Sequence, residues 1–167
     1  MAIGIETERK LIIKMPDFST IMSEEGYQRS EITQIYFASE CGVTHRVRKR
    51  VFQNKTAYTE TKKTRISQMS VIEEENEISK AEYDTLLSTL FVVGRLTKTR
   101  HIFTYLEHTI EIDVYPEWTK SCVLEVELGS EDETLILPSY IEMLRDVSGS
   151  REYSNHTMSQ KFPEEII

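Results

Sequence analysis

The feature that most constrains the fold is an alternation of charged residues with apolar or neutral ones along short segments. Near the N-terminus, Glu6, Glu8 and Lys10 occupy every second position. Successive side chains of an extended strand point to opposite faces, so these three would share one face. A solvated face of an antiparallel sheet is the commonest cause of such a pattern. This segment alone therefore leaves two interpretations open, a solvated face and a charged interior.

The same alternation recurs in five later segments, each of which carries mainly one sign of charge on one face. The residues are Arg46, Arg48 and Arg50; Glu75 and Glu77; Lys98 and Arg100; Glu111 and Asp113; and Glu125 and Glu127. In the last two segments the alternate positions are aliphatic, so their other face must pack on protein. The solvent face of an open sheet would usually mix both signs with neutral polar residues. A closed barrel with a charged lumen accounts for the pattern better.

The remaining periodicity predicts an α+β protein with mostly sequential strands. Strands are expected over 4–14, 31–38, 43–51, 56–63, 70–78, 95–105, 108–115 and 122–129. One helix is predicted over 79–91, where Ser79 and Glu82 form a capping box, a second from Pro138 to Gly149, and a shorter one within 16–28. We therefore expect a closed or nearly closed eight-stranded antiparallel β-barrel, with a few helices packed on its outer apolar faces.

Composition limits the class of protein. A chain of 167 residues with 39% hydrophobic content fits a single domain over 1–167. A net charge of -8 argues against nucleic-acid binding through a broadly basic surface. Cys41 and Cys122 are too far apart for a zinc site or a disulfide framework, and no apolar run approaches the ~18 residues of a membrane span. We expect a cytoplasmic protein with neither a membrane nor a nucleic acid as partner.

A charged lumen also predicts a class of ligand. Buried charges at this density are tolerated only if other side chains, water or a highly charged ligand compensate them. A polyphosphate with divalent metal ions would compensate both signs of charge, because its oxygens bind Arg and Lys and the metal ions bind the carboxylates.

These residues resemble a known family. The pattern Glu-x-Glu-x-Lys, here Glu6, Glu8 and Lys10, is similar to the signature of the CYTH superfamily, the triphosphate tunnel metalloenzymes. The resemblance continues in order through the charged pairs above, a lysine in AYTETK, and the C-terminal segment REYSNHTMS. One such pair is weak evidence, but the whole ordered series is strong. In length and ending, the chain looks most like short bacterial inorganic tripolyphosphatases.

The resemblance implies roles for individual residues. It implies that Mg²⁺ or Mn²⁺ is held by Glu6, Glu8 and Glu127, and we take Glu125 and Asp113 as further candidate ligands. Glu75 and Glu77 match a pair implicated in activating water or holding a second metal. The candidate phosphate-binding cations are Lys10, Arg46, Arg48, Lys62, Lys98, Arg100 and Arg151.

Some positions remain ambiguous. Lys62 is the preferred tunnel lysine because it is in phase with Tyr58 and Glu60, but Lys63 would take its place if the strand carries a bulge. His156 stands where a second basic residue might be expected. Tyr36 could contact substrate, although an aromatic residue in such a strand more often serves packing.

Three functions are consistent with the sequence. The expected one is metal-dependent hydrolysis of inorganic tripolyphosphate or a small organic triphosphate. A class IV adenylyl cyclase is an alternative, but no base-reading loop is evident. The third is a non-catalytic module that binds polyphosphate or nucleotides, against which Glu6, Glu8 and Glu127 argue. The particular triphosphate, the preferred metal, and the choice between a monomer and a homodimer are left open.

Overall fold

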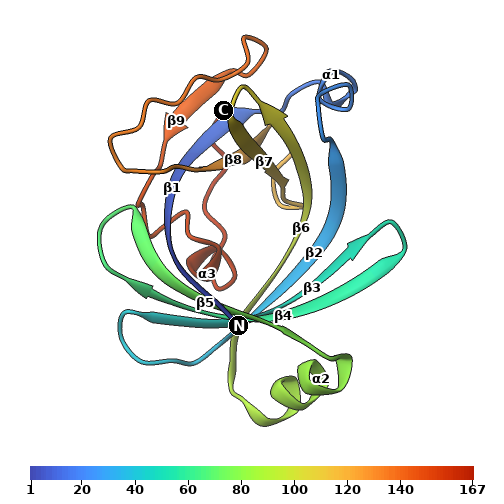
Figure 1. Ribbon diagram of the computed structural model, residues 1–167, viewed down its shortest axis with the longest axis vertical. Helices are drawn as coiled ribbons and strands as arrows, with labels where there is room; N and C mark the ends of the chain where they lie inside the picture. Colours follow the sequence, from blue (N-terminus) through green and yellow to red (C-terminus); the bar gives the residue numbers. More distant parts are fainter.

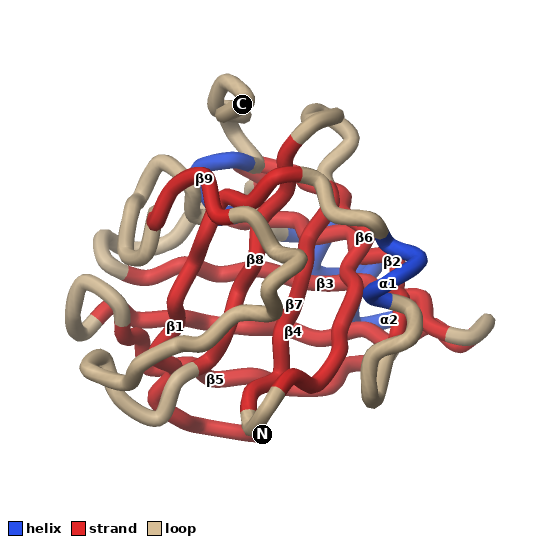
Figure 2. The backbone as a smooth tube through the Cα atoms, turned by 90° about the horizontal axis from the view of Figure 1, so that it is seen from above, coloured by secondary structure: helices blue, strands red, loops and turns tan.

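The structure, a computed structural model covering residues 1–167, is built on one antiparallel sheet that closes on itself (Figure 1). Its strands are β1 (Ala2–Lys14), β2 (Gln28–Phe37), β3 (Val43–Phe52), β4 (Lys55–Arg65), β5 (Ser70–Ile78), β6 (Val92–Tyr105), β7 (His108–Val114), β8 (Ser121–Glu127) and β9 (Met143–Asp146). They follow the order β5-β4-β3-β2-β6-β7-β8-β1-β9, and β5 also pairs with β1. The first eight strands therefore form the predicted closed barrel, whose curved wall is seen in Figure 2.

Three helices accompany the barrel: α1 (Phe18–Ile21), α2 (Lys80–Thr89) and α3 (Asn155–Met158). The predicted capping box of α2 is confirmed, since the Ser79 side chain accepts from the Glu82 N–H and the Glu82 carboxylate accepts from the Ser79 N–H. Tyr83 of α2 packs with Ile35 and Val47 on the outer face of β2 and β3. This contact holds the helix against the outside of the barrel.

The predicted helix over 138–149 is wrong. This region forms a turn at 138–141 followed by β9, which pairs with β1 at Leu11–Ile13. The reason is tertiary: β1 pairs with β5 only as far as Thr7, so the remainder of that edge needs another partner for its backbone groups. β9 supplies those hydrogen bonds, and its pairing overrides the local helical pattern.

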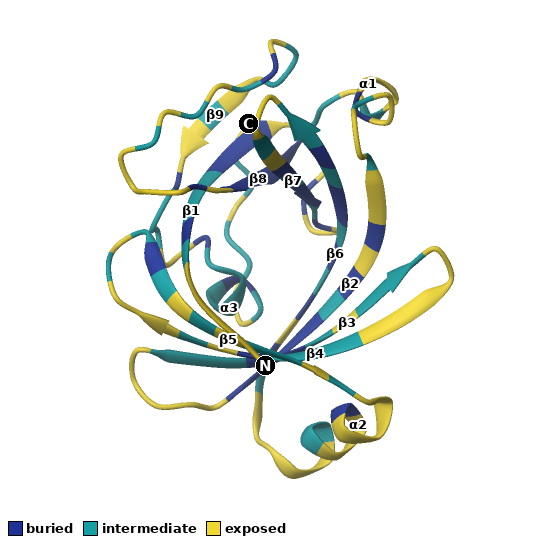
Figure 3. Cartoon of the chain, in the orientation of Figure 1, coloured by how far each residue is buried: buried dark blue, intermediate teal, exposed yellow.

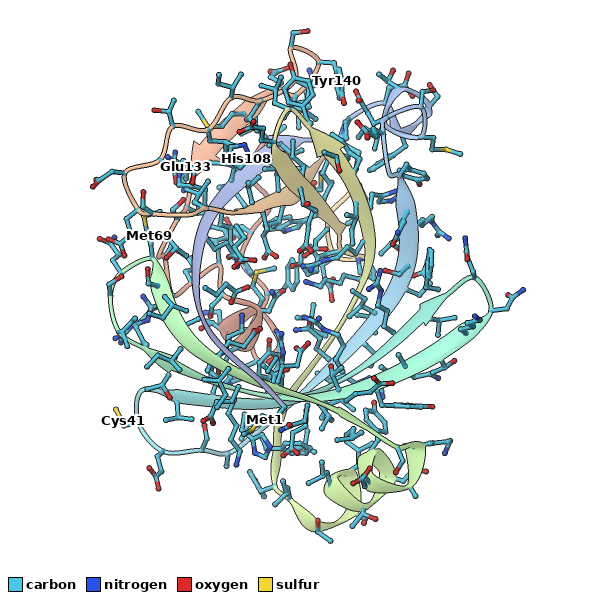
Figure 4. The ribbon with its side chains drawn as sticks, viewed as in Figure 1. Met1, Cys41, Met69, His108, Glu133 and Tyr140 are labelled. Atoms are coloured by element: carbon cyan, nitrogen blue, oxygen red, sulfur yellow. The ribbon has the colours of Figure 1, made fainter.

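The outer apolar faces of β1, β6, β7 and β8 form the largest hydrophobic cluster, shown as dark-blue strand segments in Figure 3. Its cover is mostly the long loop 129–141, through Leu135, Leu137 and Tyr140, together with α1. His108 Nε2 lies 2.6 Å from Glu133 Oε1 and fastens this loop to β7; Figure 4 labels both residues. The expected helical cover is thus replaced here by a loop.

A second cluster lies inside one end of the barrel. Ile12, Leu96 and Val123 come from the inward faces of β1, β6 and β8, and the C-terminal segment adds Tyr153 and Met158. The chain after β9 therefore turns into the ring of strands, where α3 is seen in Figure 1. This C-terminal plug fills part of the lumen and leaves the rest as a cavity.

None of the three helices is long and apolar enough to cross a membrane.

Candidate active site

A cavity of about 820 Å³ lies between the inward faces of the strands and the C-terminal plug. Most of the predicted charged pairs contribute to its wall, because the inward face of each strand is the charged one. The charged lining residues are Glu6, Glu8, Lys10, Glu40, Arg46, Arg48, Lys63, Arg65, Glu73, Glu75, Arg100, Glu111, Glu125 and Arg151. The structure therefore assembles the charged lumen that the alternation predicts.

In one part of this lumen the charged side chains form ion pairs with one another. The buried Asp113 carboxylate accepts from Lys98 Nζ at 2.5 Å and from Arg100 Nε and Nη2, each at 2.7 Å. Arg100 Nη2 also donates to Glu125 at 2.8 Å, and Lys10 Nζ lies 3.0 Å from the other Glu125 oxygen. We call Lys10, Lys98, Arg100, Asp113 and Glu125 the ion network.

The ion network changes several predicted roles. Burial by itself raises the pKa of Asp113 and Glu125, but the neighbouring cations more than offset it and hold both pKa values below their usual range. Each carboxylate is therefore committed to cations, which disfavours the prediction that they hold a metal ion. The Lys98 side chain is wholly enclosed and does not line the cavity, so its predicted contact with phosphate is not supported either.

Arg46 and Arg48 on β3 are in the opposite situation. Both line the cavity, neither forms an ion pair with a carboxylate, and the Nε–H of each is buried without a hydrogen-bond partner. Arg48 Nη2 reaches only the neutral Gln34 Oε1, at 3.2 Å. Burial, and then repulsion from Arg46 and Arg100, lowers the pKa of Arg48 to about 10. Despite its burial, Tyr36, Glu73 and Glu6 together raise the pKa of Arg46, although neither carboxylate is close enough to form an ion pair with it. Two neighbouring guanidinium groups without a directly bonded carboxylate are suited to a multivalent anion.

Carboxylates gather on β1 and β5, which continue the barrel wall beyond β4. Lys63 Nζ forms a close ion pair with Glu6 and lies 3.1 Å from Glu73 Oε2. Burial, and then the charge of Glu125, raises the pKa of Glu8 to about 7, although Lys10 Nζ is 3.4 Å away. An additional cation beside Glu8 would stabilise the charged carboxylate and lower its pKa.

Glu6 and Glu8 fit a divalent metal ion by their chemistry, because they offer hard oxygen donors at the cavity surface. No three acidic, histidine or cysteine side chains are grouped as a ready metal cage. Glu127, the third predicted ligand, is exposed and lies with Glu6 and Glu73 around a separate small depression. The fit therefore rests on Glu6 and Glu8, with the remaining ligands left to substrate oxygens and water.

The preference for Lys62 as the tunnel lysine is wrong. The pairing of β3 with β4 is regular and contains no bulge, and it places Lys63 inward and Lys62 outward, exposed to solvent. Tyr58, which set the predicted phase, packs against Tyr83 of α2 on the outside of the barrel. Tyr58 therefore lies on the outer face of β4, and Lys62, which is in phase with it, lies on that face too.

Strand β5 has the predicted bounds and phase, but only one residue of the predicted pair Glu75 and Glu77 faces the cavity. Glu75 faces the cavity and accepts from Thr61 Oγ1 at 2.9 Å, but Glu77 is exposed and lies outside the cavity. Glu73, two residues earlier and on the same face, lines the cavity instead. The alternation could have revealed Glu73, since it continues the series of Glu75 and Glu77.

Loop residues, some of them charged, line the remainder of the cavity. The loop between β2 and β3, which includes Cys41, and the turn around Met69 both border it; Figure 4 labels these two residues. Arg151 is exposed at the rim. The C-terminal plug adds Ser154, Asn155, His156, Thr157 and Gln160. The loop residues and Gln160 follow no charged alternation and lie outside the segment REYSNHTMS, so the sequence did not indicate them.

Solved structures share this fold. The structure of the inorganic triphosphatase NE1496 superposes with a TM-score of 0.59 at 22% identity, over 95% of this chain and 97% of that one. A protein of Bacillus halodurans named as a candidate adenylate cyclase gives a TM-score of 0.58 at 20% identity, over 79% and 84% of the two chains. The PH1012 protein of Pyrococcus horikoshii OT3 gives 0.56 at 20% identity, over 76% and 80%.

At these identities the likeness establishes the fold. No curated protein matches the chain significantly. The family model for the CYTH domain, however, matches residues 4–160, nearly the whole sequence. This protein therefore belongs to the CYTH family.

Proposed function

We propose that the protein hydrolyses a triphosphate with the help of a divalent metal ion. The observation that carries the proposal is the pair Arg46, which is buried, and Arg48, which is half-buried; both line the cavity and neither forms an ion pair with a carboxylate. Burying unpaired cations is costly, so a fold that retains two of them needs an anionic ligand. Membership of the CYTH family and the likeness to an inorganic triphosphatase favour a triphosphate as that ligand.

The proposed binding step uses two arginines that lack a carboxylate partner, together with Lys63, which has two. The forked guanidinium groups of Arg46 and Arg48 would donate to non-bridging phosphate oxygens. Lys63, which pairs with Glu6 and Glu73, would contact the phosphate chain from β4, the strand beside β3. Phosphoryl transfer depends mainly on holding the phosphates in line and neutralising the developing charge, and these three residues would do both.

Glu6 and Glu8 would hold the metal ion on the acidic wall. Mg²⁺ or Mn²⁺ would act there as a Lewis acid toward the phosphate oxygens. The raised pKa of Glu8 is the supporting feature, because a carboxyl destabilised in its charged form by burial and by Glu125 gains from a nearby cation.

Glu75 is the proposed residue for orienting the attacking water. Its carboxylate lines the cavity and is held by the Thr61 hydroxyl at 2.9 Å. Glu77 lies outside the cavity and is not proposed for this role. The ion network would act indirectly, since it holds β6, β7 and β8 in register and fixes the Arg100 and Lys10 side chains at the wall.

The test is a product screen over inorganic tripolyphosphate and the nucleoside triphosphates, with Mg²⁺ or Mn²⁺ and with a chelator. Metal-dependent release of orthophosphate that is lost in Arg48→Ala would support the proposal. Conversion of ATP to cyclic AMP and pyrophosphate would replace it with the cyclase function. Tight binding without turnover would leave a non-catalytic binding module.

A further inference from the structure

Gln34 is a wholly buried amide in the wall of the charged lumen. It lies on β2, its side chain has no exposed surface, and its cross-strand partner on the neighbouring strand β3 is Arg48 (Figure 1). A buried amide needs hydrogen-bond partners for both its oxygen and its nitrogen. The partners of Gln34 therefore indicate why an amide occupies this position.

Gln34 connects Arg48 to the core of the protein. Its Oε1 accepts from Arg48 Nη2 at 3.2 Å, and its Nε2 donates at 2.8 Å to the hydroxyl of Tyr36, which is a buried core residue. A guanidinium group can only donate hydrogen bonds, so the amide oxygen must face Arg48 and the amide nitrogen must face Tyr36. The orientation of the amide is thereby fixed. Its oxygen is the single hydrogen-bond acceptor that the protein offers to the Arg48 side chain.

On the other side of the lumen, the matching position carries a carboxylate. Arg100 on β6 has Asp113 on β7 as its cross-strand partner, and Arg100 Nε and Nη2 each donate to that carboxylate at 2.7 Å. Arg48 has a cross-strand partner in the same relation, but this partner is neutral. A glutamate at position 34 would have the same shape and would place a carboxylate against Arg48. The amide instead holds the guanidinium and leaves its charge uncompensated.

From this contrast we infer that Gln34 is a positioning residue of the phosphate site: its amide orients the Arg48 guanidinium at the cavity wall without neutralising it. The inference rests on the proposed function, because it assumes that Arg48 binds phosphate oxygens. A guanidinium group that is already oriented loses less side-chain freedom when it binds a phosphate. Gln34 itself does not line the cavity, so its effect on a ligand must pass through a neighbouring side chain.

The experiment compares two substitutions of Gln34 by calorimetry with inorganic tripolyphosphate and with ATP, each with and without Mg²⁺, and by thermal melts without ligand. Gln34→Glu keeps the shape and the acceptor for Arg48 but adds a negative charge, so binding should weaken about tenfold. The new carboxylate would pair with Arg48, and the melting temperature should stay within about 2 °C of the wild type or rise. Gln34→Met removes both hydrogen bonds but leaves Arg48 charged. It should weaken binding only about threefold and lower the melting temperature by about 3–6 °C.

The opposite order of the two variants in binding and in stability separates positioning from packing. If Gln34 served packing alone, the isosteric change Gln34→Glu would be the milder one in both measurements. The matched control is Gln28→Glu, which adds the same charge at an exposed position of the same strand, outside the cavity. Gln28 lies about 20 Å along β2 from Gln34, so this control should change neither the affinity nor the melting temperature.

The variant Arg48→Met tests whether the effect passes through Arg48. When Arg48→Met is already present, Gln34→Met should change the affinity less than 1.5-fold, because coupled residues are not additive. This double variant also decides the question if Gln34→Glu does not fold. An equal loss from Gln34→Met in both backgrounds, or a Gln34→Glu variant that binds at least as tightly as Gln34→Met, would overturn the inference while the proposed function stands. If neither ligand binds the wild type, or if Arg48→Met binds both as tightly as the wild type, the proposed function fails and this inference fails with it.

Discussion

The two sides of the lumen use the same residue types for opposite purposes. On β6, β7 and β8, Lys98 and Arg100 are enclosed with Asp113 and Glu125, so charge is neutralised within the protein. On β3, Arg46 is buried and Arg48 is half-buried, and no carboxylate is bonded to either. A charged lumen of this kind therefore contains both structural charge and charge available to a ligand. Ion pairing distinguishes them, whereas position in the strand does not.

The largest expected effect is on the stability of the neutralised side. Asp113→Asn keeps the shape of the side chain but leaves Lys98 without a carboxylate and deprives Arg100 of one. Removing one partner of a buried ion pair costs about 3–5 kcal/mol, so we expect a loss of that order in the free energy of unfolding. Urea denaturation followed by circular dichroism is the measurement. A loss below 1 kcal/mol would show that the ion network is not structural.

The second prediction concerns the side of the lumen formed by β3, where we expect a loss of ligand affinity without a loss of stability. Arg48→Met removes a half-buried cation whose buried Nε–H has no partner, so stability should be unchanged or rise by up to about 1 kcal/mol. The same change deletes charge-assisted hydrogen bonds to phosphate of about 1.5–3 kcal/mol in total. Tripolyphosphate affinity, measured by calorimetry, should fall about 10- to 100-fold. Strong destabilisation with intact affinity would reverse the assignment of the two sides.

Sequence reasoning succeeded where one face of a strand was unambiguous. In β7 and β8, aliphatic residues alternate with Glu111, Asp113 and Glu125, and only one phase can pack on protein. In β4, threonines lie on both faces, so the choice between Lys62 and Lys63 depended on Tyr58, whose ring is covered by α2. That contact is tertiary, and no local pattern encodes it.

Two further features could not be predicted because they depend on distant parts of the chain. The strand β9 forms because β1 has an unpaired edge beyond Thr7, although its own residues also suit a helix. The commitment of Lys98 to Asp113 depends on side chains from β6 and β7 meeting across the strand pair, and only the register of those strands sets it. Alternation therefore predicted which residues face the lumen, but not which of them are already neutralised.

The third prediction is a pH dependence set by Glu8. Its pKa is about 7 in the folded protein against 4.5 in the unfolded chain, so between these values the folded state binds more protons. Stability should accordingly fall as pH rises from about 4.5 to about 7. In a chelator, Glu8→Gln should melt at the wild-type temperature at pH 4.5 but be more stable by about 1–2 kcal/mol at pH 8. A variant equally stable or less stable at pH 8 would show that Glu8 is not destabilised in its charged form.

The smallest effect separates the two neighbouring lysines of β4 and tests which face of that strand belongs to the lumen. Lys63→Ala removes the cation between Glu6 and Glu73, which would weaken tripolyphosphate binding about tenfold and lower stability by about 1 kcal/mol. Lys62→Ala removes an exposed side chain on the outer face, so affinity and melting temperature should both stay within error of the wild type. Calorimetry and thermal melts of the two variants, which differ by one position and share the same chemistry, provide a matched pair. If Lys62→Ala produced the larger loss of affinity, the inward face of β4 would be the one that carries Tyr58 and Glu60, and the regular pairing of β3 with β4 could not hold in solution.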